Sequence, residues 1–85
     1  MAWTIEYTDT AEKQLGKLDR QTARRIVDYM SERVAVLDDP RDLGGALTGP
    51  LGGLWRYRVG DYRVICDIQD RVLVTRVSRR DQAYR

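Results

Sequence analysis

The segment LWRYRVGDYRVICDI, residues 54–68, constrains the fold more than any other part of the chain, because its residues alternate around a central Gly60-Asp61 pair. A two-residue Gly-Asp connection between alternating segments predicts a β-hairpin. The turn also fixes which residues lie opposite each other. The predicted pairs are Val59 with Tyr62, Arg58 with Arg63, Tyr57 with Val64, Arg56 with Ile65 and Trp55 with Cys66.

The predicted hairpin has one basic and one apolar face, because side chains of a strand alternate between the two sides of a sheet. Arg56, Arg58 and Arg63 share the basic face. Like charges directly across a strand pair are destabilising, so a fold that keeps them is expected to bind an anion there. The apolar face is expected to comprise Trp55, Tyr57, Val59, Tyr62, Val64 and Cys66.

Charge is distributed unevenly along the 85 residues, although the formal net charge is only +2. Residues 1–53 hold 7 basic and 9 acidic residues, whereas residues 54–85 hold 8 basic residues, all arginine, and 4 acidic ones. This pattern favours a local patch for phosphate or an acidic partner. The alternative is an arginine-rich surface that is simply solvated.

Two helices are expected before the hairpin. Residues 3–7 alternate as a short strand, and Asp9 then predicts the start of a helix that runs to about Leu18. Asp19 predicts the start of a longer helix, which ends at the Asp38-Asp39-Pro40 run. The apolar stripe of that helix is expected to comprise Ala23, Ile26, Val27, Met30, Val34 and Leu37.

A loop and a last strand complete the predicted fold. The glycine-rich residues 41–53 predict a loop with one short extended piece, and residues 71–78 predict a strand that follows a tight turn near Asp70. The predicted fold is a single α+β domain over residues 1–85. Its elements follow in the order β-α-α-β-β-β, with a mostly antiparallel sheet and a helical hairpin on one face. If that turn has two residues, Leu73, Thr75 and Val77 face the core, and Val72, Val74, Arg76, Ser78 and Arg80 join the basic face. A turn that differs by one residue would reverse this assignment.

The composition excludes several kinds of chemistry. The chain has no histidine, which removes the commonest general base and most zinc and iron sites. Cys66 is the only cysteine, so it is expected to be an inert core residue in a reducing cytoplasm, and no metal or cofactor is predicted. No apolar run is long enough to span a bilayer, and no leader segment is apparent.

Arginine and tyrosine remain as candidate functional side chains. The planar arginine fork matches phosphate oxygens, and several forks on one face could stabilise a pentacoordinate phosphorus transition state. In RNA the 2′-hydroxyl next to the scissile phosphate already provides the nucleophile. Tyr84 is the candidate base, with base stacking or terminal packing as the alternatives. Lys13 and Lys17 on the first helix are either a solvated face or a second basic patch for RNA.

Four motifs together carry a resemblance to a known family. They are Trp-x-Ile-Glu-Tyr at 3–7, Asp-Pro-Arg at 39–41, the run from Leu47 through WRYRVGDYR to Arg63, and Val-x-x-Arg-x-x-x-Tyr-Arg at 77–85. The chain resembles, over essentially its whole length, the RelE toxins of bacterial type II toxin–antitoxin systems, within the RelE/ParE superfamily.

The resemblance implies a ribosome-dependent endoribonuclease, an mRNA interferase of the bacterial cytoplasm that cuts without a metal and blocks translation. Its implied partners are the ribosome, messenger RNA and a cognate antitoxin of the RelB-like or Phd/YefM-like kind, with operon DNA reached only through the antitoxin. The implied catalytic residues are Arg56, Arg58, Arg63, Arg80 and Tyr84. Further RNA-binding residues are expected at Arg76, Arg79, Arg85, Lys13 and Lys17.

The sequence departs from the family pattern in two ways, and two alternative hypotheses for the function remain open. Arg79 occupies a position where many relatives carry histidine, and Arg56 and Arg58 release a proton less readily than the lysine found in some relatives. One alternative is a ParE-like toxin that inhibits DNA gyrase by binding and has no nuclease chemistry. The other is a toxin whose activity has decayed.

Overall fold

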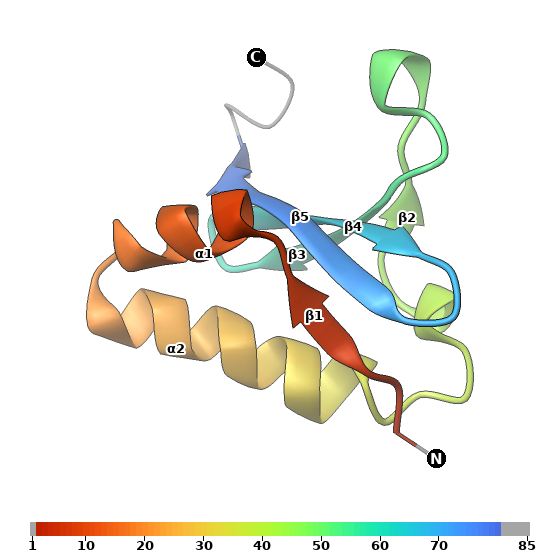
Figure 1. Cartoon of the computed structure of the whole chain (residues 1–85), viewed down its shortest axis with the longest axis horizontal. Helices are drawn as coiled ribbons and strands as arrows, with labels where there is room; N and C mark the ends of the chain where they lie inside the picture. Colours follow the sequence, from red (N-terminus) through yellow and green to blue (C-terminus); the bar gives the residue numbers. More distant parts are fainter. Residues whose placement is uncertain (1, 81–85) are drawn as a thin grey trace.

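The computed structural model describes residues 2–80, and these form an α+β fold in which two helices cover one face of a five-stranded sheet (Figure 1). The strand order is β1-β5-β4-β3-β2, and β1 and β5 are the one parallel pair of neighbours. None of the helices in this part of the chain is long and apolar enough to cross a membrane. In chain order the helices and strands are β1 (Ile5–Tyr7), α1 (Asp9–Gly16), α2 (Arg20–Tyr29), β2 (Gly45–Ala46), β3 (Trp55–Val59), β4 (Tyr62–Ile68) and β5 (Val72–Arg79).

Each helix is capped at its N-terminus by a side chain. The Thr8 hydroxyl, one residue before the predicted cap Asp9, accepts a hydrogen bond from the Ala11 amide at 3.1 Å. Thr8 already has the extended backbone that a cap requires, so Asp9 becomes the first helical residue. Asp19 caps α2 as predicted, with its carboxylate 3.1 Å from the Thr22 amide nitrogen.

The second helix is shorter and less regular than predicted. A π-helical turn over Met30–Val34 extends α2, because the Ala35 amide donates to the Met30 carbonyl five residues earlier. The helix therefore ends before the Asp38-Asp39-Pro40 run. The predicted stripe is confirmed for Ile26, Met30 and Val34, which are fully buried, but Val27 is 39% exposed and lies outside it.

The predicted hairpin is confirmed in every pair. Tyr57 lies opposite Val64 and Arg58 opposite Arg63, and the turn is Gly60-Asp61. Gly60 has a φ of +59°, a backbone conformation that glycine adopts without strain. The apolar face of the hairpin forms the core against the helices. Its residues are Tyr57, Val59, Val64 and Cys66, with Trp55 and Tyr62 packed at the margin.

The last strand follows the predicted facing only in part. Val77, in the core, and Arg76 and Ser78, on the other face, are confirmed by the register. The predicted outward facing of Val72 and Val74 is wrong, because both are fully buried in the core, and Leu73 and Thr75 are not core residues.

A longer turn and a β-bulge explain this correction. The connection between β4 and β5 spans residues 69–71 rather than two residues, which reverses the facing of the start of β5. Cys66 pairs with Val74 while Ile65 pairs with Arg76, so Thr75 is the extra residue and the facing reverses again. Backbone groups around the bulge bond to the N-terminal region. The Gln14 side chain accepts from the Val77 amide at 2.6 Å, and the Thr8 hydroxyl donates to the Thr75 carbonyl at 3.2 Å.

The short extended piece predicted in residues 41–53 is β2, which pairs with the start of β3. It adds a fifth strand to the four predicted. Beyond it, the chain makes a 3₁₀ turn at Gly49–Leu51 and projects from the sheet (Figure 1).

Candidate phosphate-binding site

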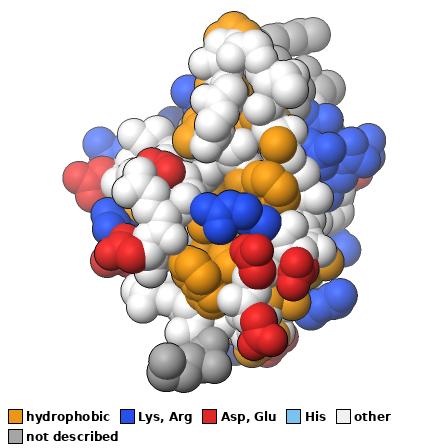
Figure 2. All heavy atoms as spheres, turned by 90° about the vertical axis from the view of Figure 1, so that its right-hand side faces the viewer, with side chains coloured by type: hydrophobic (Ala, Val, Ile, Leu, Met, Phe, Trp, Pro, Cys, Tyr) orange, Lys and Arg blue, Asp and Glu red, His pale blue; other side chains and the backbone are white. Residues whose placement is uncertain are grey.

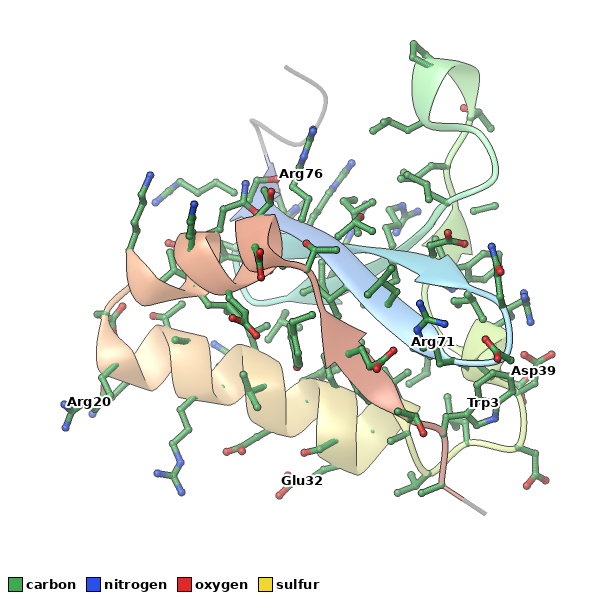
Figure 3. All side chains as sticks on the ribbon, viewed as in Figure 1. Trp3, Arg20, Glu32, Asp39, Arg71 and Arg76 are labelled. Carbon is green, nitrogen blue, oxygen red and sulfur yellow. The ribbon has the colours of Figure 1, made fainter. Side chains whose placement is uncertain are left out.

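Arginines form two rows across the face of the sheet that the helices leave open. The first row is Arg56, Ile65 and Arg76, on β3, β4 and β5. The second row is Arg58, Arg63 and Ser78 on the same strands. Arg76 projects from β5 on the side away from α2, whereas Arg20 and Glu32 project from α2 on the opposite side (Figure 3). We call Arg56, Arg58, Arg63 and Arg76 the arginine face.

The side chains of the arginine face differ in how deeply they are buried. Arg63, in the middle strand, is half-buried, and its Nε and Nη1 atoms are inaccessible to solvent. Arg58 and Arg76 are exposed on either side of the centre, and Arg56 is half-buried. Ile65 is only 1% exposed and makes an apolar floor between two arginines. A charge surrounded by low-dielectric material interacts more strongly with an incoming anion than a solvated one does.

Among residues 2–80, no carboxylate forms an ion pair with Arg56 or Arg76 of the arginine face. The ion pairs among residues 2–80 are Arg24–Asp28, Arg41–Asp39, Arg71–Glu6 and Arg71–Asp70, and none uses Arg56, Arg76 or Arg80. Acidic side chains gather instead on the side that carries the β4–β5 turn, around one basic group (Figure 2). The separation of charge favours an anionic ligand on the arginine face.

Arg80 adjoins the hairpin turn. It follows the last residue of β5, and its backbone amide donates to the Asp61 carbonyl at 2.9 Å. This bond ties the end of β5 to the turn that joins β3 to β4. Arg80 is exposed to solvent at this end of the strand.

The other predicted RNA-binding residues are not all brought together. Arg76 belongs to the arginine face, whereas Arg79 lies opposite Tyr62, a position whose side chain alternates toward the helix-covered side. Lys13 on α1 and Lys17, which directly follows α1, are exposed, and α1 packs on the other face of the sheet. Tyr84 and Arg85 lie outside the described residues.

A second basic surface adjoins Arg58. A groove of about 620 Å³ between α2 and the β3–β4 turn is lined by Arg24, Arg25, Arg33 and Arg58, together with Asp28 and Glu32. The Arg33 guanidinium lies 5.9 Å from the centre of the Tyr29 ring. The spacing of residues in the sequence does not predict that Arg58 joins these arginines of α2.

Tyrosines and the cysteine of the core do not supply acid–base groups to this face. Burial raises the pKa of Tyr7 to about 12 and also raises the pKa values of Tyr57 and Cys66. The Tyr57 hydroxyl is engaged, because it donates to the Pro40 carbonyl at 2.6 Å.

Among residues 2–80, no cluster of histidine, cysteine, aspartate or glutamate could hold a metal ion.

Two features of the site were missed by sequence reasoning. The Arg56 guanidinium lies against the backbone of Gly45, a contact between residues that a glycine-rich loop pattern does not predict. Ser78 lies on this face as predicted, but the sequence did not predict that its hydroxyl is buried with no hydrogen bond to a described residue. Only the assembled sheet brings it opposite Arg63.

Comparison with known proteins finds that this chain is similar to bacterial toxins. A family model described as the ParE toxin of the type II toxin–antitoxin system parDE matches residues 5–84. The toxin RelE of Mycobacterium tuberculosis is 34% identical over 84 residues, which cover 95% of this chain and 84% of that protein. The toxin RelG of the same organism is 30% identical and covers 100% of this chain and 99% of its own length.

A solved structure extends the similarity to three dimensions. It is the crystal structure of the toxin–antitoxin complex RelBE2 from Mycobacterium tuberculosis. One of its chains superimposes with a TM-score of 0.84 at 26% identity, over 94% of this chain and 93% of that chain. The predicted RelE-like fold is thereby confirmed, with the fifth strand as the addition.

Proposed function

The chain belongs to the RelE/ParE family of type II toxins, and from that premise we propose that it is an endoribonuclease that cuts messenger RNA on the ribosome. The observation that carries the proposal is the pair of arginine rows on the open face of the sheet. Guanidinium groups bind phosphate oxygens through paired hydrogen bonds and keep their charge at any working pH. A site for a scissile phosphate explains why the sheet retains Arg58 directly opposite Arg63.

The proposed reaction uses the 2′-hydroxyl of the RNA as nucleophile. Its oxygen attacks the adjacent phosphorus while the bond to the 5′-oxygen breaks, which leaves a 2′,3′-cyclic phosphate and a 5′-hydroxyl. The arginine face stabilises the extra negative charge of the pentacoordinate transition state, and two of the guanidinium nitrogens of Arg63 are shielded from solvent. One proton leaves the 2′-hydroxyl and one reaches the 5′-oxygen, so no metal or further reactant is needed.

Proton transfer is assigned to Tyr84 on the basis of the family resemblance. A phenol has a pKa of about 10, which nearby guanidinium groups lower. Arg79, Arg80 and Arg85 are the arginines nearest to this tyrosine along the chain. Because Arg79 replaces the histidine of many relatives, we assign no proton transfer to that position.

A cognate antitoxin is the proposed partner. The similar RelBE2 structure is a complex of toxin and antitoxin. The helical hairpin of this chain carries an apolar groove of about 570 Å³, lined by Leu15, Leu18, Ala23 and Val27 among others. An amphipathic segment of an antitoxin would bury this surface.

The test of the proposed function is Arg63→Ala. Loss of one preorganised donor to a transition-state oxyanion typically costs about 100-fold or more in kcat. We expect primer extension on ribosome-bound messages to show that loss, and expression in bacteria to cause no growth arrest. Antitoxin binding should stay unchanged as the control for folding. Cleavage by Arg63→Ala at the wild-type rate would contradict the assignment.

A gyrase inhibitor is the second candidate, and the match to the ParE-toxin model favours it. Binding without nuclease chemistry would not depend on the phosphate site. Toxicity that persists, with induction of the DNA-damage response, in a variant carrying Arg63→Ala, Arg80→Ala and Tyr84→Phe would support this candidate. Loss of toxicity in that variant, with messages cut only by the wild type, would support the nuclease.

A further inference from the structure

The hydroxyl of Ser78 is buried at the arginine face, and no residue among 2–80 hydrogen-bonds to it. Ser78 as a whole is half-buried, but its side-chain oxygen is inaccessible to solvent. Burial of a hydroxyl without a partner destabilises a fold, and most buried hydroxyls in proteins therefore have one. A group that binds to this hydroxyl only in a complex would explain its state in the free protein.

The neighbours of Ser78 on this face cannot accept its proton. Arg63 lies directly opposite on β4, Arg76 lies two residues earlier on β5, and Ile65 is the diagonal neighbour. Guanidinium groups carry N–H donors and no acceptor, and isoleucine has no polar side-chain atom. On the other side of β5, the strand β1 pairs only as far as Val74 and does not reach Ser78. Within residues 2–80, the Ser78 O–H group is therefore a donor without an acceptor.

The backbone around Ser78 is fixed on both sides. One residue earlier, the Val77 amide donates to the Gln14 side chain at 2.6 Å. Two residues later, the Arg80 amide donates to the Asp61 carbonyl at 2.9 Å. A short side chain on a fixed backbone has few positions available, so the hydroxyl is held in place before a ligand arrives.

A phosphate group has the chemistry that completes this arrangement. Its oxygens accept hydrogen bonds, and they carry the negative charge that the neighbouring guanidinium groups favour. The Nε and Nη1 atoms of Arg63 are shielded from solvent, as the Ser78 oxygen is. The β-carbons of residues directly opposite each other in a sheet lie roughly 4.5–5.5 Å apart. One phosphate can therefore contact the side chains of both Arg63 and Ser78.

We propose that Ser78 is a phosphate-binding residue of the site: its hydroxyl donates to an oxygen of the phosphate that Arg63 binds. The long side chains beside the hydroxyl turn onto the arriving phosphate and uncover it. Arg76 can do so because it is exposed and forms no ion pair with a carboxylate of residues 2–80. The inference rests on the proposed ribonuclease function for its kinetic consequence, whereas binding of a phosphate group does not depend on whether RNA is cut.

The first test is the binding of inorganic phosphate to Ser78→Ala, followed by NMR through the amide resonances of residues 63 and 78. Ser31→Ala is the matched control, because Ser31 is the other serine of the chain and its exposed hydroxyl donates to the Asp28 carbonyl of the helix. We expect the Kd for phosphate to rise about tenfold in Ser78→Ala and to stay unchanged in Ser31→Ala. Equal affinity in Ser78→Ala and the wild type would overturn the inference, and so would wild-type resonances that do not respond to phosphate.

Stability distinguishes a ligand-binding hydroxyl from one that supports the fold. In phosphate-free buffer, Ser78→Ala removes a buried hydroxyl that has no partner among the described residues, so its urea midpoint should equal or exceed that of the wild type. Added phosphate should then raise the midpoint more in the wild type than in Ser78→Ala. A lower midpoint for Ser78→Ala without phosphate would show that the hydroxyl supports the fold, and the inference would fail.

Cleavage on ribosomes separates this inference from the proposed function. We expect Ser78→Ala to lower kcat about tenfold and Ser31→Ala to cut at the wild-type rate. If the wild type cuts messages and Ser78→Ala cuts them equally fast, the proposed function stands and the inference is overturned. If the wild type binds phosphate through Ser78 but cuts no message, the proposed function is contradicted and the inference stands.

Discussion

Arg58 and Arg63 are direct neighbours across the hairpin, yet their surroundings differ. Arg63 has two guanidinium nitrogens shielded from solvent, whereas Arg58 is exposed at the margin of the arginine face. Lysine keeps the positive charge but lacks the planar fork, so the exchange removes paired hydrogen bonding alone. The burial difference predicts that the exchange matters more at Arg63.

We therefore expect Arg63→Lys to lower kcat about 10- to 100-fold and Arg58→Lys to lower it less than tenfold. Single-turnover cleavage of a ribosome-bound message measures both rates. Each variant is the control for the other, because both keep the net charge. Equal losses would show that desolvation of Arg63 contributes nothing to the site.

At the scale of elements, the hydroxyl of Tyr57 joins the sheet to the segment before β2. Its bond to the Pro40 carbonyl is buried, so Tyr57→Phe leaves that carbonyl without its partner. We expect a loss of about 1–3 kcal/mol in the free energy of unfolding, measured by urea titration. Tyr62→Phe removes a hydroxyl with no hydrogen bond to a described residue, and should cost less than about 0.5 kcal/mol.

The buried phenols also predict how stability depends on pH. Burial raises the pKa of Tyr7 to about 12 and raises that of Tyr57 further, from an ordinary value of 10.0. The neutral phenol is favoured by folding, so the contribution is complete below pH 10 and declines as pH rises toward the folded-state values. Urea titrations between pH 9 and pH 11 should show this decline, and Tyr57→Phe should weaken it.

Local patterns predicted the hairpin because a two-residue turn fixes the register by itself. They did not predict the facing of Val72 and Val74, because the connection between β4 and β5 has three residues instead of two. They also did not predict the bulge at Thr75, where the side chains of Thr8 and Gln14, more than sixty residues away in the chain, bond to the backbone. The contact of Gly45 with Arg56 was missed because it depends on the pairing of β2 with β3. The identities of the site arginines were therefore predictable, whereas their orientation required the assembled sheet.

At the scale of the whole molecule, the sheet separates two surfaces. The arginine face is open on one side, and the apolar groove of the helical hairpin lies on the other, built from α1 and α2. Val27 lines that groove and is 39% exposed, so it can change without disturbing the core. If RNA uses one surface and the antitoxin the other, the two activities can be separated by mutation.

We expect Val27→Glu to weaken antitoxin binding about 10- to 100-fold, because a carboxylate would replace an apolar contact and lose its hydration in the interface. Its cleavage of ribosome-bound messages should equal that of the wild type. Arg63→Ala should show the reverse, with normal antitoxin affinity and no cleavage. Calorimetric titration with the antitoxin and primer extension measure the two properties. Loss of both properties in either variant, without loss of folding, would show that the antitoxin reaches across to the arginine face.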